Sequence, residues 1–115
     1  MPFEIMTRDV GAVTVLVLSG RLDGTPETGA VHETVRSLIA QGRKKLVLDM
    51  GGVPWANSLG IGTLISSSAT ARKAGATLVL CDVGERLLKS LSICGIVPGA
   101  LDVHEDADAA VASLR

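Results

Sequence analysis

The fold is decided by the stretch 45–64, KLVLDMGGVPWANSLGIGTL. Its first half is apolar and typical of a buried strand, whereas the Gly51-Gly52 pair and Pro54 are expected to interrupt regular structure. Asn57 and Ser58 then precede a helical pattern, and both residue types favour helix starts. The stretch predicts strand, loop and helix. It places the Ser58 hydroxyl at a helix N-terminus, where unpaired N–H groups and the helix dipole favour a phosphate.

Before this stretch, the sequence predicts a hairpin and a helix. Residues 3–7 and 13–19 are strand candidates, separated by the turn-like break at 8–11. The second strand is almost uninterrupted and β-branched, which is typical of a central strand covered on both faces. Thr25 and Pro26 then read as an N-cap and a first-turn proline, and they open a helix that continues to about Gln41. The apolar stripe of this helix consists of Val31, Val35, Leu38 and Ile39.

After this stretch, helices and strands alternate. We expect the second helix to bury the face formed by Ile61, Leu64, Ile65, Ser68 and Ala69 and to end at Gly75. The remaining predicted elements are a strand at 76–81, a helix at 84–94, a break at 95–99, a short strand at 101–103 and a helix at 106–114. The fold class is therefore α/β: one domain over residues 1–115, with a mixed, mostly parallel sheet opened by an N-terminal hairpin and about four helices.

Charge and composition exclude several kinds of partner. The formal net charge is -1, from 11 basic and 12 acidic residues, and the chain has one Phe, one Trp and no Tyr. Such a chain offers neither a basic surface for phosphates nor aromatic platforms for bases, so no direct nucleic-acid partner is expected. An apolar run of about 18 residues is missing, as is a signal-peptide pattern. We therefore expect a cytoplasmic protein without membrane insertion, a monomer or a weak oligomer.

The sequence does not predict a catalytic, metal or cofactor site. Ser58 is flanked two positions away by Ala56 and Gly60, so the Gly-x-Ser-x-Gly elbow is missing, and neither His32 nor His104 stands in a catalytic context. A dinucleotide fingerprint needs a third glycine where Ile65 stands, and the acidic cluster at 102–108 fits no ligand spacing. Cys81 and Cys94, 13 positions apart, are expected to be two buried free thiols.

An ordered set of motifs resembles the STAS domain, and more narrowly the bacterial anti-sigma factor antagonists. The motifs are Leu18-Ser19-Gly20-Arg21-Leu22-Asp23, Leu46-Val47-Leu48-Asp49, Val53-x-x-x-Asn57-Ser58-x-Gly60-Ile61-Gly62-x-Leu64, Leu78-Val79-Leu80 and Arg86-Leu87-Leu88-x-x-Leu91-x-x-x-Gly95-Ile96. The resemblance covers nearly the whole chain. It implies a regulatory protein that binds an ATP-dependent serine-kinase anti-sigma factor, releases a sigma factor, and is switched off when that kinase phosphorylates one serine.

The same resemblance assigns the phosphorylated residue to Ser58. The switch motif of the family reads Asp-Ser-Ser/Thr-Gly-Leu-Gly, and alignment on Gly60-Ile61-Gly62 places the first serine at position 58. This sequence departs from the motif at Asn57, which removes a negative charge, and at Leu59, which replaces a hydroxyl with an apolar group. The implied partner-binding residues are Arg21, Asp23, Asn57, Ser58, Leu59, Gly60, Ile61 and Gly62.

Position in the fold supports this grouping. The loop at 20–25 and the loop before Ser58 both follow the carboxyl ends of strands, where α/β proteins place their sites, so we expect them at one end of the sheet. Trp55 is either a core anchor or an exposed contact residue. Ser58 has a purely structural alternative as a helix-start residue, and Asp23 has one as a turn residue.

Two other functions are compatible with the sequence. The same domain could be an accessory subunit of a membrane transport ATPase or a scaffold in a signalling complex, for which Asn57 and Leu59 would be unsurprising. The remaining alternative is a small enzyme that uses Ser58.

Overall fold

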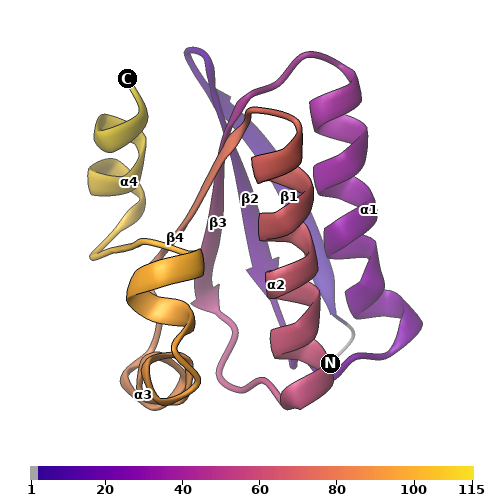
Figure 1. Cartoon of the computed structure of the whole chain (residues 1–115), viewed down its shortest axis with the longest axis vertical. Helices are drawn as coiled ribbons and strands as arrows, with labels where there is room; N and C mark the ends of the chain where they lie inside the picture. The colour runs from indigo at the N-terminus through magenta and orange to yellow at the C-terminus, as the bar shows by residue number, and fades with distance from the viewer. Residues whose placement is uncertain (1–2) are drawn as a thin grey trace.

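The computed structural model describes residues 3–115, which form a five-stranded sheet with helices on both of its faces (Figure 1). The strands are β1 (Glu4–Val10), β2 (Val13–Ser19), β3 (Lys45–Gly52), β4 (Thr77–Cys81) and β5 (Val103–His104). They lie side by side in chain order, with β1 antiparallel to β2 and all other neighbours parallel. The predicted mixed sheet with an opening hairpin is confirmed.

Four helices cover this sheet: α1 (Pro26–Ala40), α2 (Ser58–Lys73), α3 (Glu85–Ile93) and α4 (Ala107–Leu114). Their ends follow the expected signals, since Thr25 occupies the N-cap position of α1, although its side chain makes no capping hydrogen bond, and Pro26 is the first residue of that helix. Gly42 and Gly75 follow α1 and α2 at positive φ. The predicted break after α3 is the segment Ile96–Ala100, in which three consecutive residues have non-helical backbone angles.

The core has two parts, one on each side of the sheet. On one side, α1, α2 and α3 pack against fully buried leucines of the strands, namely Leu16, Leu18, Leu46, Leu48 and Leu80. On the other side, α4 packs against Val13, Val15, Val47, Val79 and Cys81. Figure 1 shows α4 apart from the α1–α2 pair. Both faces of β2 and β3 are therefore covered, which explains their uninterrupted apolar sequences.

The prediction that Gly51 and Gly52 interrupt regular structure was wrong. Strand β3 continues through both residues, and Gly52 pairs with Ser19 after a shift of register in the β2–β3 ladder. A Cβ on Gly52 would lie 2.8 Å from the carbonyl oxygen of Leu18, so glycine is needed here for close strand approach.

The face of α2 that is buried also differs from the predicted one. The residues that face the core are Gly60, Leu64, Ser67, Ser68 and Ala71. Ile65 is 43% exposed and Ala69 is exposed, although both were expected inside. The Ser68 hydroxyl is satisfied by the carbonyl of Ala100 at 2.9 Å, and Ser67 donates to Thr63 at 2.8 Å. Leu64 and Ser68 are thus buried as predicted, whereas the buried Ser67 lies outside the predicted face.

Three further predictions need correction. The hairpin turn is shorter than expected, because residues 8–10 belong to β1 and only Gly11 and Ala12 turn, with Gly11 at φ +62. Strand β5 lies at 103–104, and Leu101 is a buried core residue before it. Cys81 is buried as predicted, whereas Cys94 at the end of α3 is exposed.

Candidate functional site

Two loops meet at one end of the sheet, as predicted. One follows β2 and contains residues 20–25, and the other follows β3 and contains residues 53–57. Leu22 and Ala56 form an isolated parallel bridge, in which the Leu22 N–H donates to the Trp55 carbonyl at 3.0 Å and the Asn57 N–H donates to the Leu22 carbonyl at 3.2 Å. Strand-like pairing therefore continues beyond the two strands and joins the loops.

Asn57 holds this junction to the start of α2. Its side-chain oxygen Oδ1 accepts a hydrogen bond from the Gly60 N–H at 2.9 Å, which is the N-capping interaction. Its side-chain nitrogen Nδ2 donates to the carbonyl of Asp23 at 2.8 Å. The side-chain amide thus forms hydrogen bonds through both its oxygen and its nitrogen, and Asn57 connects the helix to the loop that follows β2.

Ser58 is the first residue of α2, and its side chain is exposed. Within residues 3–115, the Ser58 hydroxyl group makes no hydrogen bond. The N–H groups of the first helical turn lie next to it, so a negative group at this position would meet the positive end of the helix dipole. The geometry therefore leaves the hydroxyl exposed and favours an anion there.

Two glycines allow the loops to pack tightly against α2. A Cβ on Gly60 would overlap the carbonyl group of Leu22, and a Cβ on Gly24, at φ +82, would overlap the Leu59 side chain. Gly62 is different, because a Cβ there would have no atom within 4 Å. Close approach thus explains two of these glycines and does not explain Gly62.

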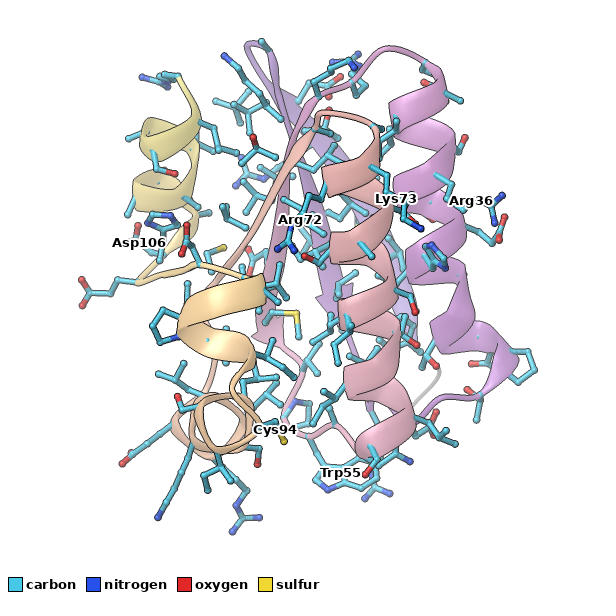
Figure 2. The ribbon with its side chains drawn as sticks, in the orientation of Figure 1. Arg36, Trp55, Arg72, Lys73, Cys94 and Asp106 are labelled. Carbon is cyan, nitrogen blue, oxygen red and sulfur yellow. The ribbon has the colours of Figure 1, made fainter. Side chains whose placement is uncertain are left out.

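Apolar and aromatic side chains are exposed on either side of Ser58 in the sequence. Leu59 is 69% exposed and Trp55 is 41% exposed, whereas Ile61 is half-buried and packs against the core. Figure 2 shows Trp55 beside the first turn of α2. The Arg21 guanidinium lies over the Trp55 ring, 5.8 Å from its centroid. Trp55 is therefore a surface residue and not a core anchor.

Asp23 supplies a negative charge to the same end. Its Oδ1 accepts a hydrogen bond from the Thr25 N–H at 3.2 Å. This hydrogen bond, together with the side chain of Thr25 and the nearby Arg21 charge, lowers the pKa of Asp23 from its usual range. The carboxylate is ionised at neutral pH, so the loop presents fixed charges of both signs.

A cleft of about 330 Å³ extends the site towards α3. It is lined by Pro54, Trp55, Ala56, Arg86, Leu87 and Ser90. Sequence reasoning did not include Arg86 among the site residues. No periodicity signals this placement, because it depends on how the loop after β3 lies against α3.

Neither histidine is hydrogen-bonded to Ser58 in the part of the chain that the structure describes. His32 Nε2 lies 2.7 Å from Thr70 Oγ1, which links α1 to α2. Thr70 is twelve positions along the helix from Ser58, or about 18 Å at the usual rise per residue. His104 belongs to β5, where it pairs in register with Cys81. Within residues 3–115, no three His, Cys, Asp or Glu side chains are grouped so that they could hold a metal ion.

The model of the STAS domain family matches residues 4–108. A putative anti-sigma factor antagonist from Thermotoga maritima is similar in structure, with a TM-score of 0.86 and 16% identity over 96% of this chain and 94% of that one. The Bacillus cell fate determinant SpoIIAA in its phosphorylated form gives a TM-score of 0.74 and 16% identity over 97% and 100%. A sulfate transporter family protein from Wolinella succinogenes gives 0.80 and 24% over 93% and 88%.

No curated protein sequence matches the chain. Among the helices of residues 3–115, none combines the length and the apolar character that crossing a membrane requires. The neighbours share the fold, including the predicted sheet and opening hairpin, and the family match extends over nearly all of the sequence. The chain therefore belongs to the STAS domain family.

Proposed function

We propose that this STAS domain is an anti-sigma factor antagonist that binds a serine-kinase anti-sigma factor and is regulated by phosphorylation of Ser58. The observation that carries the proposal is the exposed Ser58 hydroxyl at the first residue of α2, beside the loop that follows β2. The proposed contact surface consists of Arg21, Asp23, Asn57, Ser58, Leu59, Gly60, Ile61 and Gly62.

The mechanism is a change of surface charge and needs no change of fold. Phosphorylation adds about -1.5 to -2 charges at neutral pH. At a helix N-terminus that charge is tolerated by the domain itself, because the dipole and the free N–H groups favour it. A docked partner, in contrast, would have to bury the charge or face it with its own acidic groups, either of which weakens association.

The departures from the family motif have defined consequences. Asn57 retains the N-cap acceptor and adds a donor to the Asp23 carbonyl, so the loop geometry does not depend on an aspartate. Leu59 adds an exposed apolar side chain, which favours contact with a protein surface.

The test is incubation with ATP, Mg²⁺ and each serine-kinase anti-sigma factor of the source organism, followed by intact-mass and peptide analysis. One phosphate on Ser58 is expected. Ser58→Ala should take up none, whereas Ser66→Ala, which changes another exposed serine of α2, should behave like the wild type. Phosphate on Ser66 or no phosphate at all would contradict this regulation.

A second candidate, an accessory domain of a membrane transport protein, is favoured by one observation. The transporter-family neighbour has a TM-score of 0.80 and a higher identity, 24%, than the antagonists described above. In that case the domain would co-purify with a transport protein from its own cell and would not bind the kinases.

A further inference from the structure

The end of the molecule that carries Ser58 exposes apolar side chains that the domain does not cover. Leu59 is 69% exposed, and Trp55 is 41% exposed although its backbone carbonyl is held by the Leu22 N–H. An exposed Trp on an ordered loop offers a large contact area at a small entropic cost, and such residues dominate many protein interfaces. These two residues therefore mark a docking surface.

The cleft beside Trp55 gives this surface a shape. It lies between the loop at 53–57 and α3, and both contribute to its walls. Arg86 reaches it from α3, while Arg21 stacks over the Trp55 ring from the loop that follows β2. Arg86 and Trp55 thus line the same cleft, and Arg21 contacts the Trp55 ring from another part of the chain.

Neither arginine forms an ion pair closer than 4 Å with a carboxylate of residues 3–115, although Asp23 lies near enough to Arg21 for the Arg21 charge to contribute to the lowered pKa of Asp23. Within residues 3–115, the ion pairs closer than 4 Å are Arg36 with Glu33 and Arg43 with Asp9, and neither pair involves Arg21 or Arg86. The six residues that line the cleft include Arg86 and no Asp or Glu. Guanidinium groups bind carboxylates through two parallel hydrogen bonds and are weakly hydrated, so they suit a partly buried pair. Charge complementarity therefore favours an acidic occupant.

We propose that this cleft receives an Asp or Glu side chain of the serine-kinase anti-sigma factor, while apolar residues of the same partner cover Trp55 and Leu59. The inference rests on the proposed function and adds the kind of residue that the partner must present. It also adds an electrostatic step to the switch, since a phosphate on Ser58 would repel the acidic segment and compete for the same arginines.

The test compares two charge reversals on α3. Arg86→Glu changes the residue that lines the cleft, and Lys89→Glu makes the same change at an exposed position of α3 outside the cleft lining. Binding of the unphosphorylated domain to the kinase is measured by calorimetry. Loss of a charge-assisted pair and the new repulsion should weaken binding by about tenfold or more in Arg86→Glu. Lys89→Glu should change it less than about threefold.

Two further measurements complete the test. Urea unfolding of both variants should match the wild type, because both side chains are exposed. The wild-type affinity should fall with added salt, and Arg86→Glu should reduce that dependence. Equal effects of the two reversals on kinase binding would overturn the cleft assignment.

Failure of this inference and failure of the proposed function are separable. If Ser58 phosphorylation weakens kinase binding but Arg86→Glu does not, the cleft assignment is wrong and the proposed function stands. If the wild-type domain binds none of the serine-kinase anti-sigma factors, both are contradicted.

Discussion

Gly60 of α2 lies directly against the carbonyl group of Leu22, so closely that a methyl group at position 60 would overlap it. Leu22 belongs to the loop after β2, and its carbonyl also accepts the Asn57 N–H at 3.2 Å. The contact therefore sets how near the first turn of α2 lies to the neighbouring loop, and with it the position of Ser58.

Gly60→Ala should destabilise the domain for this reason. Overpacking against backbone costs about 1–3 kcal/mol or more, because a carbonyl cannot move aside like a side chain. Gly62→Ala is the matched control: nothing lies within 4 Å of its Cβ, and alanine should stabilise the helix by about 0.5–1 kcal/mol. Urea unfolding measures both. Similar effects of the two changes would mean that the contact with Leu22 does not constrain the helix.

Asn57 should be the most sensitive polar position of the site. Asn57→Ala removes the cap to Gly60 and the bond to the Asp23 carbonyl, and should lower the free energy of unfolding by about 1–2 kcal/mol. Asn57→Asp keeps the cap and loses only the donor, so it should lie between Ala and the wild type. An Asp variant as unstable as the Ala variant would show that the bond to Asp23 dominates over the cap.

A negative charge at Ser58 should leave the fold intact. Ser58→Asp mimics part of the phosphate charge, and the helix dipole should stabilise it by about 0.3–1 kcal/mol at low salt. Ser66→Asp, in the middle of the same helix, should not gain this stabilisation. Loss of cooperative unfolding in Ser58→Asp would contradict a switch that acts on association alone.

Cys81 should make stability fall at high pH. Burial, followed by the charges of Asp49, Asp82 and Asp106, raises the pKa of Cys81 from 9.0 to about 12. The folded thiol therefore keeps its proton at a pH where the unfolded thiol loses it, so the free energy of unfolding falls as pH rises from about 9 towards 12. From about pH 8 to about pH 10.5 the loss should be about 1–2 kcal/mol.

Two cysteine variants isolate this effect. Cys81→Ala should remove that part of the pH dependence, even though it lowers stability at every pH by leaving a small cavity. Cys94→Ala, at the exposed cysteine, should keep the wild-type dependence. Parallel pH profiles for all three proteins would show that Cys81 does not titrate as expected.

Patterns of hydrophobicity and capping were sufficient to predict the sheet, the hairpin and the helix ends. Residues 13–18 and 46–48 have too little polar character for anything but covered strands, and Thr25-Pro26 and Gly42 bound α1 with residues that suit those positions for steric reasons. The meeting of the two loops also followed from topology, because parallel strands end at the same edge of a sheet.

Close packing of small residues explains the failure at Gly52. This residue continues β3 because the absence of a Cβ lets Ser19 and the Leu18 carbonyl come near it. The contact depends on residues far away in sequence. The same holds for Arg86, which joins the site only because the loop after β3 lies beside α3. Local patterns do not encode such contacts.

The most direct test of the account is the affinity of one serine-kinase anti-sigma factor for the domain before and after phosphorylation. We predict that the unphosphorylated domain binds, and that a phosphate confined to Ser58 weakens binding by about tenfold or more while thermal unfolding stays cooperative. Equal affinities for the two forms, with the phosphate mapped to Ser58, would contradict the central claim.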